Sequence, residues 1–204
     1  MTLKRFEALK PWIEGKRVLH IGCVQHNWQK SLTNSWIHAY IVKQSREAMG
    51  IDILEEGVRE LAEGGYKVET ADAENFDLNA EFDVIFAGEL IEHLEDLGGF
   101  LDSCKRHMGA ESKLIITTPN SFGIVYFITR LFGIRFVNPE HTCWFDEQTI
   151  GQLLNRHSLE VIERKFLPIY STNLSRTQNA VLQVIESLFP KRFRATLFMV
   201  SQKQ

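Results

Sequence analysis

The chain has 204 residues, 44% of them hydrophobic and 24% charged, which suits one soluble domain able to bury a sizeable core. Its formal net charge of -3 gives no broad attraction to nucleic acid, so DNA is excluded as a partner and RNA is disfavoured. Three cysteines without close pairing indicate neither a disulfide framework nor a cysteine metal site, and they suit the reduced cytoplasm. No apolar run reaches membrane-spanning length, and the first residues lack the apolar core of a secretion signal.

Short apolar runs alternate with helical patterns through the first half of the chain. Strands are expected at Arg17–Ile21, Met49–Ile53, Lys67–Ala71, Asp83–Ala87 and Leu114–Thr117. Helices are expected between them, at Trp36–Arg46, Glu55–Glu63 and Leu97–Met108. This alternation is typical of βαβ crossovers, in which helices cover both faces of a largely parallel sheet. The first half therefore reads as a doubly wound α/β fold.

The second half continues with a helix, a strand, a helix and a strand. They are expected at Asp146–His157, with Asp146 as the cap, and at Leu159–Phe166, Thr177–Leu188 and Thr196–Ser201. Without any sign of a linker or a repeat, the seven strands are expected in one domain spanning residues 1–204.

Ionisable residues crowd the end of the fourth expected strand. Glu89, Glu92 and His93 follow Gly88, directly after the apolar run 84–87. Charged groups at the end of a buried strand cost free energy unless they are used. In an open α/β sheet the carboxyl ends of the strands are where ligands bind. This segment is therefore the first candidate for a functional site.

Two other strand ends carry residues suited to a nucleotide-like ligand. Gly22 follows the first strand and lets the backbone turn tightly beside a ligand. Asp52 ends the second strand, where a carboxylate can accept both hydroxyls of a ribose, and Asp72 follows the third. Either aspartate alone is more often a cap or a turn residue, but their succession favours a binding site. A dinucleotide is disfavoured, because Val24 and Asn27 stand where its motif needs glycines.

The segment Glu81–Leu94 resembles the fourth motif of class I S-adenosylmethionine (SAM) dependent methyltransferases. It is most similar to the type 11/23 group, which includes ubiquinone-pathway and glycan-tailoring O-methyltransferases. The resemblance covers the chain from about Lys16 onward. It implies a Rossmann-like sheet of seven strands, mostly parallel with an antiparallel last strand, and SAM as the cofactor.

The resemblance also implies which residues bind the cofactor. Asp52 would hold the ribose, and Asp72 would accept from the adenine amino group. The sequence departs from the family pattern at His20, where an acid usually takes the methionine amino group, and at Val24, where glycine is common. The full expected set is His20, Gly22, Cys23, Asp52, Ile53, Asp72, Ala73 and Gly88.

Methyl transfer to a hydroxyl needs an aligned nucleophile and a proton acceptor. The candidate catalytic residues are His141, His93 and Glu89, and histidine suits the task because its ordinary pKa lies near neutrality. Glu-x-x-Glu-His also resembles the divalent-metal motif of ribose methyltransferases acting on small-RNA ends. That resemblance implies the metal ligands Glu89, Glu92, His93 and His141, the first three on one face of a helical turn. A metal-free base is the alternative.

Residues 121–137 form an unusually apolar and aromatic insertion, interrupted by Arg130 and Arg135. Three uses stay open: a lid over the site, a dock for an apolar or lipid-linked acceptor, and an interfacial helix in peripheral contact with a membrane. We favour the lid. Asn120, just before the insertion, either orients a substrate hydroxyl or belongs to a plain turn.

The sequence thus predicts a cytoplasmic SAM-dependent methyltransferase that methylates an oxygen of a small-molecule or saccharide acceptor. One alternative is a non-catalytic SAM-binding or protein-interaction module on a degenerate fold, which His20 and the altered glycine loop favour. The other is a metal-dependent RNA ribose methyltransferase, against which the net acidity weighs. The sequence predicts no oligomeric state.

Overall fold

The computed structural model describes residues 3–24, 36–134, 138–170 and 174–204. These residues contain a seven-stranded sheet in the order β3-β2-β1-β4-β5-β7-β6. The neighbouring strands from β3 to β5 are all parallel to one another. The strand β7 runs antiparallel to both its neighbours, β5 and β6. The Rossmann-like sheet with an antiparallel last strand is therefore confirmed. The strands are β1 (Arg17–Ile21), β2 (Glu47–Asp52), β3 (Val68–Thr70), β4 (Phe82–Gly88), β5 (Met108–Pro119), β6 (Leu159–Leu167) and β7 (Thr196–Lys203).

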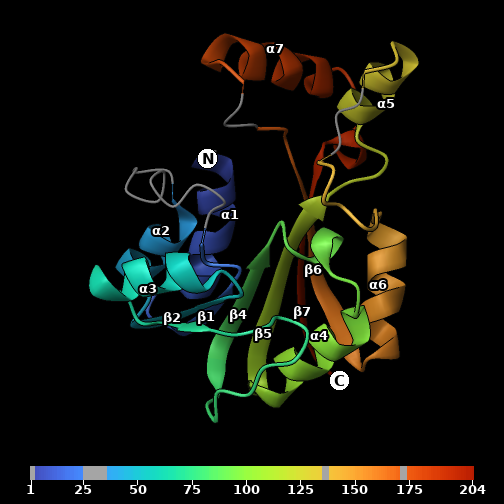
Figure 1. Ribbon diagram of the computed structural model, residues 1–204. Helices are drawn as coiled ribbons and strands as arrows, with labels where there is room; N and C mark the ends of the chain where they lie inside the picture. Colours follow the sequence, from blue (N-terminus) through green and yellow to red (C-terminus); the bar gives the residue numbers. More distant parts are fainter. Residues whose placement is uncertain (1–2, 25–35, 135–137, 171–173) are drawn as a thin grey trace.

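Helices cover both faces of this sheet (Figure 1). Alternate residues of β1 and β4 point to opposite faces, as the pleat requires, so Leu19 and Ile85 join one apolar cluster whereas Val18 and Phe86 join another. The first cluster packs under α4 and α6, and the second packs under α1 and α2. The helices are α1 (Leu3–Ile13), α2 (Ile37–Gln44), α3 (Glu55–Glu63), α4 (Leu97–Arg106), α5 (Ile124–Leu131), α6 (Glu147–Arg156) and α7 (Arg176–Ser187), with short 3-10 turns η2 (Ile91–His93) and η3 (Lys191–Phe193).

Helix α1 is an element that the sequence analysis did not identify. Leu9 and Ile13 are fully buried against the sheet, and Pro11 lies inside the helix. Proline disfavours helix interiors, which weakens the sequence signal for this segment. The helix α6 begins as expected, because the Asp146 carboxylate accepts the backbone N–H groups of residues 148 and 149.

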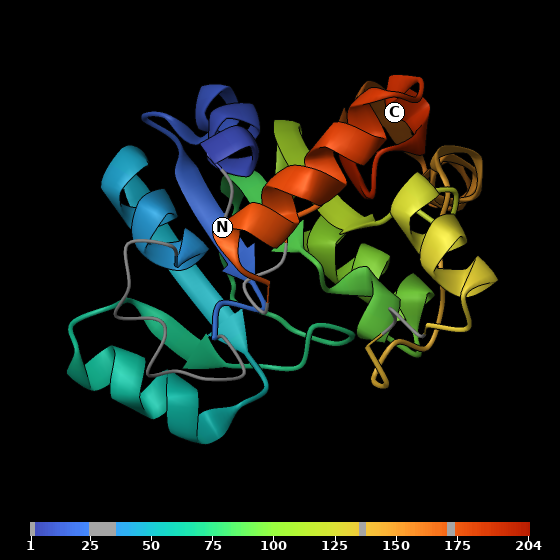
Figure 2. The ribbon, with the colours of Figure 1, turned by 90° about the horizontal axis from the view of Figure 1, so that it is seen from above.

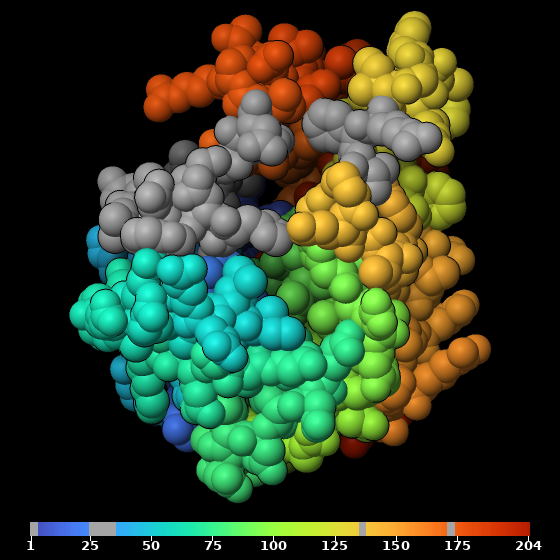
Figure 3. All heavy atoms as spheres, in the orientation of Figure 1, coloured from blue at the N-terminus to red at the C-terminus, as the bar shows by residue number. Residues whose placement is uncertain are grey.

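Two helices stand above the carboxyl ends of the strands. Figures 1 and 2 show α5 and α7 side by side there, and Figure 3 shows their atoms projecting at the upper end of the molecule. They share a small apolar core of Val125, Ile169 and Ala195. The predicted insertion contains the helix α5 at Ile124–Leu131, while its last residues, 135–137, lie outside the described part of the chain. Within the described ranges, no helix is long and apolar enough to span a membrane.

Candidate functional site

The sheet reverses its winding direction between β1 and β4, which lie side by side at its centre. At such a switch point the loops after the two strands diverge and leave a crevice for a ligand. Gly22 leaves β1 with φ +76°, a conformation in which any other residue would be strained. Gly88 ends β4 in the neighbouring position. Both predicted glycines therefore flank the switch point.

Asp52 ties together the loops that follow β1 and β2. The side chain is buried, and its two oxygens accept the backbone N–H groups of Val24 at 2.8 Å and Leu54 at 3.1 Å. These bonds hold the carboxylate at the carboxyl end of β2, the edge of the sheet where ligands of such folds bind. Ile53, next in the chain, exposes 65% of its surface at the same strand end. An exposed apolar side chain beside a carboxylate suits the base and ribose of a nucleoside.

Asp72 and Ala73 lie beyond β3, on the same edge of the sheet as Asp52. The backbone N–H of Ala71 donates to the Asp52 carbonyl at 3.0 Å, which joins the two strand ends. The exposed Asp72 carboxylate accepts the N–H of Glu74 at 2.9 Å, so it also performs the turn-forming role that an aspartate commonly has. Ala73 packs partly against the main core.

His20 and Cys23 turn their side chains into the core. The Nδ1 atom of His20 lies 3.1 Å from the Nδ1 atom of His38 on α2, so one of the two rings must donate a hydrogen there and the other accept it. Burial lowers the pKa of His20, with a further contribution from His38, and lowers the pKa of His38 to about 4. Cys23 packs against Trp36 and Leu61, and burial raises the pKa of its thiol. Only the backbone of Cys23 is therefore placed to meet a ligand.

Glu89 stands directly after β4 in a left-handed conformation, with φ +55°. Its N–H donates to the Thr117 carbonyl at 2.7 Å, and its carboxylate accepts from the Arg5 guanidinium at 2.6 Å. The expected helical turn carrying Glu89, Glu92 and His93 on one face is wrong, because the turn η2 covers only residues 91–93. Glu89 itself is the left-handed residue, and it lies before η2, so its side chain does not share a helical face with those of Glu92 and His93.

Glu92 is a buried acid at the centre of the cluster. One carboxylate oxygen accepts from the Thr118 hydroxyl at 2.9 Å, and the other is buried without a partner in the structure. Burial, followed by repulsion from Glu89, raises the pKa of Glu92 to about 8. The backbone carbonyl of Glu92 accepts the N–H of Thr142 at 2.8 Å. This bond brings the loop with His141 back to the end of β4.

Three of the four predicted metal ligands come together. Ligand atoms of Glu92, His93 and His141 lie within 4.8 Å of one another, and the two rings meet edge to face with centroids 4.7 Å apart. The Nδ1 atom of His141 is buried without a hydrogen-bond partner in the structure. Burial, followed by the neighbouring His93, lowers the pKa of His141. Glu89, paired with Arg5, is not part of this group.

Two residues at this site were missed by the sequence analysis. Arg5 comes from the unpredicted α1, and Tyr126 comes from α5, where its ring meets Trp144 edge to face at 5.1 Å. Burial, followed by repulsion from Glu89, raises the pKa of Tyr126. The only available signal was the aromatic content of the insertion. Asn120 favours the structural alternative, because its amide donates to the carbonyls of Arg192 at 2.9 Å and Arg194 at 2.7 Å.

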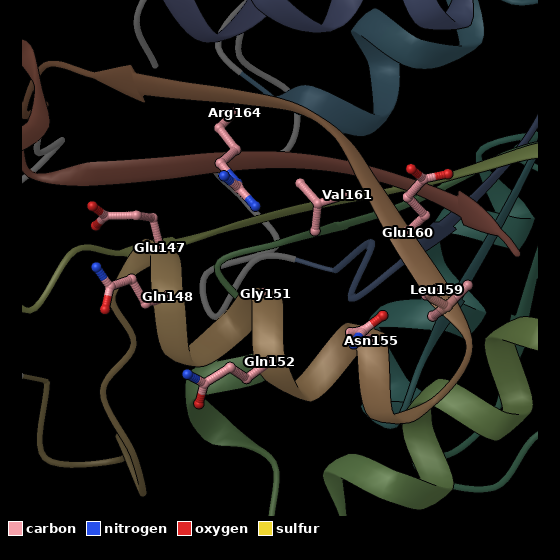
Figure 4. A pocket seen from close by; sticks show the side chains of 9 residues that line it. All are labelled: Glu147, Gln148, Gly151, Gln152, Asn155, Leu159, Glu160, Val161 and Arg164. Carbon is pink, nitrogen blue, oxygen red and sulfur yellow. The ribbon is translucent and has the colours of Figure 1, made fainter.

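A separate hollow of about 460 Å³ lies between α6 and β6, at the edge of the sheet (Figure 4). The side chains that line it include Arg164 and two glutamates, Glu147 and Glu160. None of the predicted site residues lines it. The strand ends around β1 and β4 therefore remain the candidate site.

Known proteins resemble this chain in both sequence and structure. A family model described as a methyltransferase domain matches residues 3–164. A ubiquinone biosynthesis O-methyltransferase from Aromatoleum aromaticum is 30% identical over 112 residues, which are 53% of this chain and 46% of that relative. The matched part thus spans about half the length of the relative.

Solved structures extend the likeness of the fold over almost the whole chain. A SAM-dependent methyltransferase from Archaeoglobus fulgidus has a TM-score of 0.65 at 21% identity, with 98% of this chain and 92% of that chain covered. A magnesium protoporphyrin IX methyltransferase from Synechocystis, solved with bound SAH, has a TM-score of 0.65 at 12% identity, with 98% and 83% covered.

Proposed function

Because this chain belongs to the methyltransferase-domain family, as a class I SAM-dependent member, we propose that it methylates an oxygen atom of a small-molecule or saccharide acceptor. The observation that carries the proposal is the titratable cluster at the end of β4, beside the switch point of the sheet. The resemblance to a ubiquinone biosynthesis O-methyltransferase supports oxygen as the methylated atom. The proposed setting is the cytoplasm, which the free cysteines support.

The proposed binding site for SAM, called the SAM seat below, consists of residues at the carboxyl ends of β1, β2, β3 and β4. Gly22 and Gly88 give the cofactor access to the backbone, Asp52 accepts from the ribose hydroxyls, and Asp72 with Ala73 takes the adenine edge. The left-handed conformation of Gly22, which glycine adopts without strain, and the place of Asp52 at the carboxyl end of β2 support this fit. Bound SAM supplies an electrophilic methyl group. The seat also includes exposed Ile53, the backbone of Cys23 and, as a positioning residue behind the loop, His20.

His141 is the proposed proton acceptor. Its lowered pKa keeps the ring neutral at neutral pH, and its unpartnered Nδ1 leaves a ring nitrogen available for the acceptor's hydroxyl. His93 lies against its ring and is the second candidate. Glu89 is proposed to orient the acceptor, as Arg5 holds its carboxylate at the end of β4. The helix α5 with Tyr126 would form the lid over this mouth.

A divalent metal held by Glu92, His93 and His141 is a second candidate for activating the acceptor. It is favoured by the closeness of the three ligand atoms and by the unpartnered Glu92 oxygen and His141 nitrogen. One oxygen and two nitrogen donors suit Mn²⁺, Fe²⁺ or Zn²⁺ better than Mg²⁺. Such an ion would supply Lewis acidity at the acceptor oxygen. Glu89 is no longer part of the proposed ligand set, since Arg5 holds it.

Calorimetric titration with SAM, followed by an acceptor screen with labelled methyl groups, tests the proposed function. Binding of SAM together with label transfer to oxygen supports it. Binding without transfer to any acceptor would favour the non-catalytic module, and transfer to an RNA ribose would favour the RNA alternative. Absence of SAM binding would overturn both the seat and the reaction.

A further inference from the structure

The upper surface of α5 and α7 is apolar although it faces outward. We call it the apolar cap face and define it by the exposed side chains Phe127, Leu131, Phe132, Val181, Val184 and Leu188. Phe132 and Leu188 each expose 76% of their surface. The two helices lie side by side in both ribbon views (Figures 1 and 2), so these exposed side chains belong to neighbouring elements. Gathered apolar exposure of this kind marks an interaction surface more often than scattered single residues do.

Helix α7 packs Leu182 inward but also carries apolar side chains on the side that faces outward. Its exposed stripe carries Val181, Val184 and Leu188 at helical spacing. Its buried side carries Asn179 and Glu186. The Glu186 carboxylate accepts the N–H groups of Ile169 and Ala195, each at 2.7 Å, and so anchors the helix with its polar side inward. A surface helix normally buries its apolar stripe, so this outward stripe needs an apolar partner.

The charged residues in the two segments that carry the apolar cap face are almost all cations. Within 121–134 and 174–194 the only acid is Glu186, which is buried and hydrogen-bonded. The same segments contain five cations: Arg130, Arg176, Lys191, Arg192 and Arg194. If two copies met symmetrically through this face, cations would oppose cations with no exposed carboxylate from these segments to offset them. An apolar face on segments that carry several cations and no exposed acid fits a partner that is anionic at its surface and apolar beneath.

We propose that the apolar cap face docks on the surface of an anionic lipid bilayer. The exposed Phe127, Leu131, Phe132 and Leu188 enter the boundary between head groups and acyl chains, while Arg130 and the cations beside α7 meet the lipid phosphates. The contact is interfacial, because neither helix is long enough to span the membrane. It goes beyond the proposed methyl transfer and does not depend on it. It would place the mouth of the site, beneath the cap, next to amphiphilic acceptors.

Flotation of the full chain with vesicles tests the docking. Vesicles of phosphatidylcholine mixed with phosphatidylglycerol should carry the protein, and vesicles of phosphatidylcholine alone should carry much less. The double variant Phe132→Glu with Leu188→Glu should lower the partition coefficient at least about tenfold. Arg130→Ala should lower it about fivefold, the value for removing one cation near the surface. Matched controls on α2 are Val42→Glu and Lys43→Ala, both at exposed positions, which should leave partition unchanged.

Calorimetric SAM binding, measured on the same preparations, verifies that each variant is folded and separates this proposal from the proposed reaction. Equal partition of the parent into both kinds of vesicle, or equal losses in the α2 controls, would overturn the docking. So would a dimer, detected by sedimentation, that dissociates in the Phe132→Glu and Leu188→Glu variant, because the face would then belong to a second copy. Loss of SAM binding with intact partition would overturn the cofactor seat alone.

Discussion

The Arg5 guanidinium on α1 lies 2.6 Å from the Glu89 carboxylate at the end of β4. This pair joins the first helix of the chain to the candidate site, 84 residues later. It also sets the charge that Glu92 experiences, because Glu89 raises the pKa of Glu92 while Arg5 lowers it. A buried acid, a half-buried acid and an arginine thus form one electrostatic unit.

Glu92 should make the protein less stable as the pH rises. Its pKa is about 8 in the folded state against 4.5 for the ordinary group, so between these values the folded chain holds a proton that the unfolded chain has lost. The stabilisation that comes from this proton is therefore fully present below about pH 4.5 and is lost as the pH rises toward about 8. Over that range the free energy of unfolding should fall by at most about 1.4 kcal/mol per pH unit. Urea unfolding over this pH range measures the slope.

The variant Glu92→Gln should have a flatter pH profile than the parent, since its amide does not ionise and can still accept from Thr118. Glu111→Gln, at an exposed position of β5, is the matched control and should keep the parental slope. Equal slopes for the parent and Glu92→Gln would contradict the raised pKa.

Asp52→Ala should weaken SAM binding by about two orders of magnitude, through loss of a charge-assisted contact of roughly 2–3 kcal/mol. Calorimetry measures the affinity, and circular dichroism verifies the fold. Because Asp52 also holds the N–H groups of Val24 and Leu54, Asp52→Asn is needed beside it. The asparagine keeps one acceptor oxygen for the loops and should also bind SAM more weakly. An unchanged affinity in both variants would remove Asp52 from the seat.

His141→Gln should lower kcat by about 10²–10⁴ while leaving SAM affinity unchanged, as expected for loss of a general base. The parent rate should rise with pH through a pKa below 6.5, because burial lowers the pKa of His141 and the base must be neutral. His157→Gln, at the end of α6, is the matched histidine control. If His141→Gln retains full turnover while His93→Gln loses it, the base is His93 instead.

Removal of a metal provides an independent test of the cluster of Glu92, His93 and His141. If the metal candidate holds, elemental analysis of protein purified without a histidine tag should find a divalent ion. A chelator should then abolish turnover, and Mn²⁺, Fe²⁺ or Zn²⁺ should restore it. Glu89→Gln should keep the bound ion, because Glu89 pairs with Arg5. Full turnover in chelator, with no bound ion, rules the metal out.

Hydrogen exchange should show residues 122–134 opening at lower free energy than the sheet, since Val125 is the one buried side chain of α5. Binding of SAM and acceptor should protect the segment if it closes as a lid. Amides of β4 are the internal reference. Strong protection of 122–134 in the free protein would instead favour a purely structural role.

The sequence predicted the fold better than the arrangement of the side chains. Apolar periodicity located six strands of the described sheet to within about two residues, because a buried parallel sheet needs such runs, whereas β5 begins at Met108, well before the expected Leu114. It missed α1, where Pro11 obscures the helical pattern, and with it the partner of Glu89. Spacing in the sequence also could not place His93 beside His141, since that contact depends on the folding back of a loop onto Glu92.

The predicted cofactor-binding residues show the same difference, because the sequence predicted their positions better than the directions of their side chains. Strand order determines where Gly22 and Asp52 lie, so a sequence pattern can predict them. The direction of a side chain depends on the pleat and on the neighbouring helix, which is why His20 points to His38 rather than to the crevice. The predicted helical turn at Glu89 was wrong because a single left-handed residue precedes η2.

The neutral His20–His38 pair has a consequence for selectivity between substrate and product. The cofactor carries a sulfonium cation before the transfer, and the product that remains is a neutral thioether. An acid at position 20 would add a negative charge behind the methionine end and favour the cation. Two rings whose pKa values are lowered by burial add none at neutral pH. We therefore expect this protein to discriminate weakly between SAM and its demethylated product, so that removal of that product by another enzyme would govern its turnover.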